Sequence, residues 1–156
     1  MIKKNKKLFQ LILSQYLLGK DSIHGPSHWK RVERNGMDIA KINGGDKDVI
    51  ELFSILHDSQ RKTEGRDLEH GPRAMKFCIT IRNEYLKLTD KQFDKLCYAC
   101  NYHTAGMISK DETIGACWDA DRLDLPRVGI IPDAKYMSTN EGVRRAKLIQ
   151  IKMENH

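Results

Sequence analysis

The sequence predicts an all-α fold, a bundle of about six or seven helices that forms a single domain over residues 1–156. Two observations support this. Apolar residues recur at helical spacing in successive segments, and each segment is bounded by glycine, proline or a capping residue. In addition, no segment shows the period-2 alternation of a half-buried strand. A chain of 156 residues is long enough to bury a core without disulfide bonds.

The first three helices are expected over roughly 5–19, 26–42 and 49–57. In the first, Leu8, Leu11 and Ile12 share one face. The second begins at the pair Gly25-Pro26, since proline is tolerated in a first turn, and ends before two consecutive glycines. The third is apolar nearly all round and is therefore expected to be central.

Three further helices and a last basic one are expected over roughly 69–86, 89–103, 111–125 and 144–152. A polar loop that contains Gly65 separates the third helix from the fourth. Thr89 and Gln92 form a capping box at the start of the fifth helix. Pro126 is interpreted as the stop of the sixth.

The charge of the chain favours anionic partners. The net charge of +6 and the pI of about 9.1 suit phosphates, nucleotides or nucleic acid. Much of the excess lies in four lysines between Lys3 and Lys7, which an exposed tail explains equally well. No nucleic-acid motif with base-stacking aromatic residues is present, so nucleic acid is a partner without motif support.

Two classes of protein are excluded by composition. No apolar stretch is long enough to cross a membrane, and the basic start is not followed by a signal-peptide cleavage site, so a cytoplasmic protein is expected. The four cysteines do not form a secreted disulfide framework. Cys97 and Cys100 form a lone CxxC and are expected to be buried small hydrophobes.

The positions of the histidines and acids on these helices carry the chemical information. Five expected helices place a titratable residue on their apolar side, namely His28, His57, His70, His103 and Asp121, and Asp58 adjoins His57. Asp119 lies about 200° round the helix from Asp121 and should point elsewhere. For one histidine alone, a satisfied core residue is the simpler interpretation. Together, four His and two Asp suit a first-row divalent metal.

These residues resemble the H…HD…D signature of the HD superfamily. The order His28, His57-Asp58 and then Asp121, within Asp119-Ala-Asp-Arg-Leu-Asp124, is similar to that signature and spans about 95 residues here. Two flanking segments also resemble those of uncharacterised bacterial members of this superfamily. They are His24-Gly-Pro-Ser-His28-Trp and Glu69-His-Gly-Pro-Arg73. The resemblance implies an all-α, metal-dependent phosphohydrolase fold.

The resemblance also implies a set of metal ligands. His28, His57, Asp58 and Asp121 would hold a first divalent ion, which could be Mn, Fe, Ni, Co, Zn or Mg. Some family members hold two ions, and here His70 and His103 would complete a second site with Asp58 as the bridge. The alternatives are that His70 faces solvent at a helix start and that His103 is a cation at a helix end.

The expected function is hydrolysis of a phosphate ester, on a nucleotide or another small phosphorylated substrate, by attack of metal-bound hydroxide. Asp58, Arg61 and Arg73 are the predicted catalytic residues, because a guanidinium binds phosphate bidentately and both arginines follow a ligand by three residues. Arg122 is expected to pair with Asp119 or Asp124. The alternative is a catalytically silent, metal-stabilised module that binds nucleotides or nucleic acid.

Overall fold

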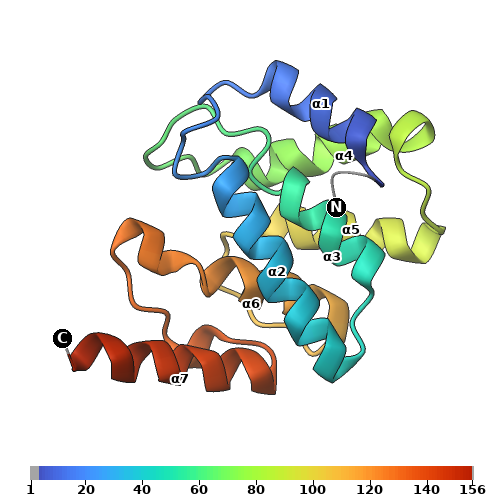
Figure 1. Ribbon diagram of the computed structural model, residues 1–156. Helices are drawn as coiled ribbons and strands as arrows, with labels where there is room; N and C mark the ends of the chain where they lie inside the picture. The colour runs from blue at the N-terminus through green and yellow to red at the C-terminus, as the bar shows by residue number, and fades with distance from the viewer. Residues whose placement is uncertain (1–3, 156) are drawn as a thin grey trace.

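The structure, a computed structural model, describes residues 4–155. Within that range the regular secondary structure is entirely helical, which confirms the all-α prediction (Figure 1). There are seven α-helices and two short 3₁₀ helices in this part of the chain. Their bounds are α1 Lys6–Gln15, α2 Pro26–Asn43, α3 Lys47–Leu56, α4 His70–Tyr85, α5 Asp90–Tyr102, α6 Glu112–Arg122, η1 Leu125–Val128, η2 Ala134–Tyr136 and α7 Asn140–Glu154.

Three helix ends differ from the sequence prediction. The first helix ends at Gln15 rather than near residue 19, because the chain becomes extended at Tyr16. Pro126 does not mark the end of α6, which closes at Arg122; the proline lies instead in the 3₁₀ turn η1. The last helix begins about one turn earlier than expected, where the Thr139 side chain accepts a hydrogen bond from a backbone N–H.

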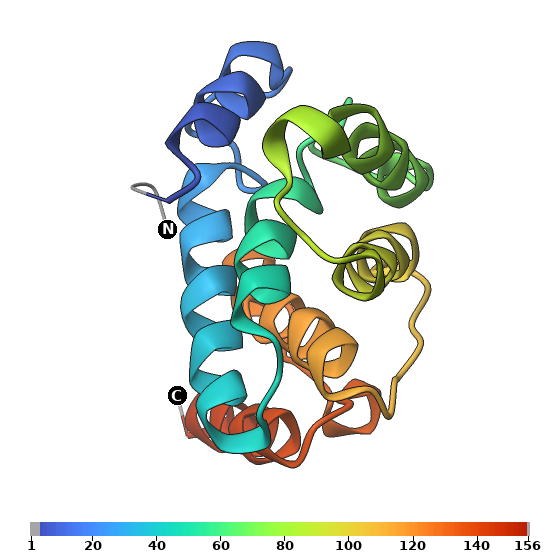
Figure 2. The same cartoon turned by 90° about the vertical axis from the view of Figure 1, so that its right-hand side faces the viewer.

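Helix α3 lies at the centre of the packing (Figure 2). It contacts α2 along one side and α5 and α6 on the others, while α4 packs on α5. Its residues 49–56 are all buried, as the apolar pattern predicted. Because α3 is enclosed, the two residues that follow it, His57 and Asp58, are delivered into the interior rather than to the surface.

The buried carboxylate of Asp119 fastens the C-terminal helix to α6. It accepts hydrogen bonds from the backbone N–H of Ser138 at 2.7 Å and from the N–H and hydroxyl of Thr139 at 2.8 and 2.7 Å. A Cβ on Gly142 would lie 2.1 Å from Asp119 Oδ2, so only glycine permits this approach. Asp119 therefore points away from the neighbouring Asp121, as the helical period predicted.

The cysteines are free thiols. Cys78, Cys100 and Cys117 are buried, and Cys97 is half-buried, so the CxxC pair belongs mainly to the core. Among residues 4–155, none of the helices combines the length and the apolar character that crossing a bilayer requires.

Candidate metal centre

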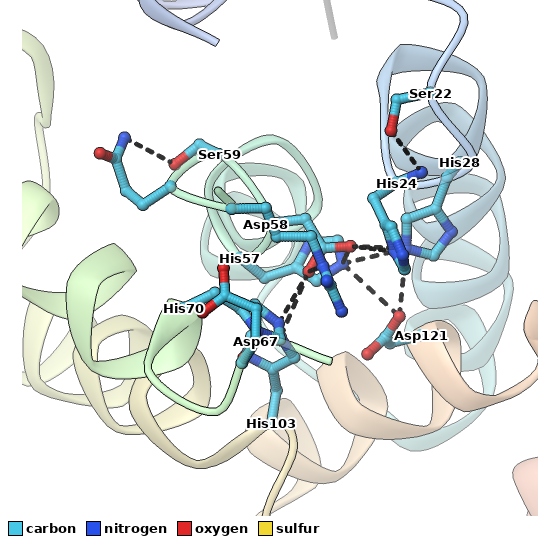
Figure 3. Close-up of polar contacts among 12 residues, drawn as sticks. Ser22, His24, His28, His57, Asp58, Ser59, Asp67, His70, His103 and Asp121 are labelled. Atoms are coloured by element: carbon cyan, nitrogen blue, oxygen red, sulfur yellow. Dashed lines mark hydrogen bonds and ion pairs between the residues drawn. The ribbon is translucent and has the colours of Figure 1, made fainter. Parts of the chain in front are cut away.

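The six predicted metal ligands come from five helices and lie together in one place (Figure 3). Five of the six side chains are buried, and that of Asp121 is 17% exposed. The ligands are His28 in the first turn of α2, His57 and Asp58 directly after α3, His70 at the start of α4, His103 directly after α5 and Asp121 in the last turn of α6. The burial of His70 excludes the solvent-facing alternative for that residue, and burial lowers the pKa of His103, which disfavours a cation there.

The Asp58 carboxylate stands between two pairs of imidazoles. Its Oδ2 lies 3.3 Å from His28 Nε2 and 3.4 Å from His57 Nε2. Its Oδ1 lies 3.1 Å from His70 Nε2 and 3.4 Å from His103 Nε2. Each carboxylate oxygen therefore faces its own pair of nitrogens, and the two groups share this one residue.

Asp121 joins the Oδ2 side of Asp58. Its Oδ1 lies 3.2 Å from His28 Nε2 and 3.5 Å from His57 Nε2. Figure 3 shows Asp121 beside His28, across Asp58 from His70 and His103. The first group thus offers two nitrogens and two carboxylates, whereas the second offers two nitrogens and one carboxylate.

The rings on the Oδ2 side are oriented by oxygen acceptors at Nδ1. Nδ1 of His28 donates to Asp124 Oδ2 at 2.7 Å, and Nδ1 of His57 donates to the Phe53 carbonyl at 3.0 Å. The His57 ring also stacks on the Phe53 ring, with centroids 4.8 Å apart. Since these oxygens only accept, the proton of each neutral ring sits on Nδ1, and Nε2 presents a lone pair to the centre.

The rings on the Oδ1 side follow the same rule. Nδ1 of His70 donates to the Asp67 carbonyl at 2.5 Å, and Nδ1 of His103 donates to the Cys100 carbonyl at 2.7 Å. All four imidazoles are therefore held as ligands in metalloproteins are held, with Nδ1–H bonded outward and Nε2 directed inward.

The inward nitrogens are too close together to be stable without positive charge. Nε2 of His28 and His57 are 3.1 Å apart, and Nε2 of His70 and His103 are 2.8 Å apart. Lone pairs at this separation repel unless a proton or a metal ion lies between them. Ligands at about 2.0–2.2 Å from a first-row ion lie roughly 2.8–3.6 Å from one another at octahedral or tetrahedral angles, and both distances fall in this range. These buried groups could hold a metal ion on each side of Asp58.

The pKa shifts of the ligand residues, with no metal bound, also show that this group of side chains favours a positive charge. Burial opposes charge on His28, but the Asp121, Asp124 and Asp58 carboxylates raise its pKa to about 9. Burial also opposes charge on His57, but Asp58 and Asp121 raise its pKa to about 10. The same contacts hold the pKa values of Asp58 and Asp121 well below their usual range, against the effect of burial.

These pKa shifts predict how the metal-free protein responds to alkali. A histidine whose pKa is raised in the folded state stabilises the fold. This stabilisation is complete below about pH 6.5, the pKa of an unfolded histidine, and is lost as the pH rises through the folded pKa. For His28 and His57 the loss should extend to about pH 10. We expect the thermal midpoint of chelator-treated protein to fall by roughly 5 °C or more over this window.

The metal-loaded protein is the control for this measurement. An ion that replaces the shared protons does not titrate, so its thermal midpoint should lack this loss. If the thermal midpoint of the chelator-treated protein stayed constant or rose between about pH 6.5 and pH 10, the raised pKa values of His28 and His57 would be contradicted.

Three further residues, which were not predicted as part of the site, lie near the centre. His24 is buried in the segment before α2; its Nε2 donates to the Glu64 carbonyl at 2.9 Å, and its Nδ1 lies 3.6 Å from Asp58 Oδ2. Asp124 follows α6 and orients His28, and Arg127 lies in η1. From the sequence, His24 could be noted only as part of the segment His24-Gly-Pro-Ser-His28-Trp, which supports the family resemblance.

A cavity of about 220 Å³ opens onto the centre. Its walls include Asp58, His70, His103 and Asp121 on the ligand side and the arginines Arg61, Arg122 and Arg127. Arg61, which was predicted to contact the substrate, lines this cavity. Arg122 departs from its prediction, because its guanidinium bonds to neither Asp119 nor Asp124 and donates instead to the Tyr136 carbonyl at 2.6 Å.

Arg73 does not line this cavity, so the predicted substrate contact has no geometric support. Its Nη2 donates to Asp67 Oδ2 at 2.5 Å and its Nε donates to the Gln60 carbonyl at 3.0 Å. These bonds brace the loop between α3 and α4. Because the Asp67 carbonyl accepts the Nδ1–H of His70, Arg73 acts on the centre only through that loop.

Gly71 allows α4 to approach α5 closely enough for His70 to meet His103. A Cβ at residue 71 would lie 2.8 Å from the Asn101 carbonyl oxygen and 2.9 Å from that of Cys100. Because these are backbone oxygens, they cannot rotate away from an added methyl group as a flexible side chain could. We expect Gly71→Ala to separate the two helix ends and to weaken any metal binding by the group of Asp58, His70 and His103 by about tenfold or more, as measured by metal titration of the full-length protein.

Gly65→Ala is the matched control, because its added Cβ meets nothing within 4 Å. It should leave both the metal stoichiometry and the thermal midpoint unchanged. Wild-type metal binding by Gly71→Ala would show that the close approach is not required for the second group of ligands.

The chain was also compared with known proteins. No protein-family model, curated protein or solved structure matched it. The resemblance to the HD superfamily therefore depends on the order of His28, His57-Asp58 and Asp121 in the sequence.

Proposed function

We propose that the protein is a metal-dependent phosphohydrolase that acts on a nucleotide or another small phosphate ester. The observation that supports this most directly is the Asp58 carboxylate, whose two oxygens each face a pair of imidazole nitrogens at 3.1–3.4 Å. A carboxylate shared in this way suits two neighbouring divalent ions, the arrangement that clamps a phosphoryl group during in-line displacement.

The roles of the residues follow from this arrangement. His28, His57, Asp58 and Asp121 would hold one ion, and Asp58, His70 and His103 the other. Bound ions supply an activated water at neutral pH and polarise a phosphoryl oxygen. The protein supplies fixed imidazoles, and the arginine-lined cavity receives the anionic substrate beside Asp58.

The alternative is a catalytically silent module that binds nucleotides or nucleic acid. Its main support was the N-terminal lysine cluster. Lys3 lies outside the described residues, and Lys4 is paired with Asp48. The cationic groups that face the candidate centre belong instead to the cavity, which favours a small phosphorylated substrate over a nucleic-acid surface.

Metal analysis followed by a substrate panel tests the proposal. Purified full-length protein should carry a first-row transition metal, and after loading with a single divalent metal it should hydrolyse phosphate esters. Absence of any transition metal, together with no turnover after addition of Mn²⁺ or Mg²⁺, would overturn the proposal. Salt-sensitive binding of nucleic acid without turnover of any phosphate ester would support the alternative.

A further inference from the structure

Arg122 is a buried cation whose hydrogen-bonding capacity is only partly used. The residue is 8% exposed, at the end of α6 next to Asp121. Its guanidinium lies over the Trp118 ring, 5.5 Å from the centroid, and Nη1 donates to the Tyr136 carbonyl. These two contacts fix the plane of the group. Its Nη2 is buried and has no hydrogen-bond partner among the described residues.

Arg61 has a similar unpaired donor on the same cavity. Its Nη1 donates to the carbonyls of Thr63 and Gly65 at 3.1 and 2.9 Å, which anchors the side chain to its own loop. Its Nε is buried without a hydrogen-bond partner in the described chain, and lies 3.7 Å from Asp58 Oδ1. A buried, charged donor without a hydrogen-bond acceptor is costly, and the 3.7 Å ion pair with Asp58 leaves the Nε–H of Arg61 unbonded, so both groups can take an acceptor from an anionic ligand.

Arg127 adds charge to the cavity rather than free donors. Its Nε and Nη1 donate to the carbonyls of Ile23 and Asp124, and its Nη2 donates to His24 Nδ1 at 3.3 Å. Its side chain is 11% exposed, so its charge is only partly screened by solvent. The cavity thus presents three guanidiniums, of which two keep a free buried N–H.

The size and lining of the cavity limit what this anion can be. Its volume of about 220 Å³ is below the range of roughly 300–1,000 Å³ typical of pockets that enclose a drug-sized ligand. Among the described residues its lining contains no Phe, Tyr or Trp ring; its rings are the imidazoles of His24, His70 and His103, and Leu125 and Val128 supply its apolar wall. The cavity therefore offers no large aromatic ring on which a nucleobase could stack, and little room for a second ester group.

We propose that this cavity selects phosphate monoesters over diesters, with Arg122 Nη2 and Arg61 Nε donating to non-bridging oxygens of the phosphoryl group. A monoester carries a charge of about −1.5 to −2 at pH 7 and three such oxygens. A diester carries a single negative charge, offers two such oxygens and brings a second organic group. The inference rests on the proposed function, because it names the substrate class of the same site.

Binding of inorganic phosphate to the metal-loaded, full-length protein tests this selection. Phosphate presents the same dianionic head without an organic group. We expect Arg122→Lys, which keeps the charge but loses the planar fork, to weaken phosphate binding by about tenfold or more in calorimetry. Arg61→Gln should weaken it similarly. The exposed Arg66 of the same loop provides the control, and Arg66→Gln should bind phosphate like the wild type.

Kinetics on a matched pair of esters complete the test. Wild-type protein should prefer p-nitrophenyl phosphate to bis(p-nitrophenyl) phosphate. Arg122→Lys should lower kcat/KM for the monoester by about tenfold or more and change that for the diester much less. Metal content and thermal midpoint are measured for every variant. If Arg122→Lys does not fold, Arg61→Gln decides the outcome.

The two proposals fail in different ways. A preference for the diester, or unchanged phosphate binding in both variants with metal intact, would overturn the monoester inference and leave the phosphohydrolase proposal standing. A wild-type protein that holds metal and binds phosphate through Arg122 yet hydrolyses neither ester would overturn the hydrolytic function and the substrate selection with it.

Discussion

Replacing Asp58 with alanine should strip the purified protein of bound metal and lower turnover by at least about 100-fold. The carboxylate is the one ligand that both groups share, since Oδ2 faces His28 and His57 while Oδ1 faces His70 and His103. Its removal leaves the His70–His103 pair without a carboxylate and the His28–His57 pair with Asp121 alone to offset the charge of a divalent ion. Elemental analysis of the variant measures the loss directly.

Asp94→Ala is the matched control for this variant. Asp94 is exposed on α5 and lies outside both groups of ligands, so its replacement should leave the metal content unchanged. Circular dichroism of both variants separates loss of metal from loss of fold. Wild-type metal content in Asp58→Ala would contradict the bridging role.

Replacing His70 and His103 together with alanine should halve the bound metal and nearly abolish turnover. The two side chains belong only to the Oδ1 group, with Nε2 atoms 3.1 and 3.4 Å from Asp58. Because both residues lie at helix ends, the helices themselves should persist, and far-UV circular dichroism should be retained. Metal stoichiometry, rather than rate, is the deciding measurement, because loss of a substrate contact would also slow turnover.

Asp121→Asn provides the reciprocal variant. Asp121 contacts only the Oδ2 group, so its replacement should weaken the other ion and leave the His70–His103 side loaded. Full metal content in the double histidine variant would indicate a centre with one ion, held by His28, His57, Asp58 and Asp121.

Residues on regular helices could be placed from the sequence because the helical period fixes their direction. His28 shares a face with core residues of α2, and Asp121 follows Cys117 by one turn on α6, so burial of one implied an inward direction for the other. The capping box at Thr89 also fixed the start of α5 correctly, since both of its hydrogen bonds form. The same period separated Asp119 from Asp121.

Other residues near the centre could not be placed in this way. His24 precedes α2, and Arg127 lies in a 3₁₀ turn, so no period connects either of them to a core face. Arg73 lies on α4, but its direction is set by Asp67 in the preceding loop, a contact that spacing does not encode. The error for Arg122 has a different origin, because Trp118 and the Tyr136 carbonyl hold its guanidinium in place of a carboxylate.

The hydrogen bonds of Asp119 couple α7 to the candidate metal centre, although α7 contributes none of the predicted ligands. Asp119 and Asp121 leave the last turn of α6 in opposite directions, one towards the start of α7 and the other towards the imidazoles. A chain cut before Ser138 would strand a buried carboxylate without its three donors, and α6 would have to shift to hydrate it. That shift would move Asp121 as well. We therefore expect a shortened chain that lacks α7 to lose the position of Asp121, although the deleted segment lies outside the candidate centre.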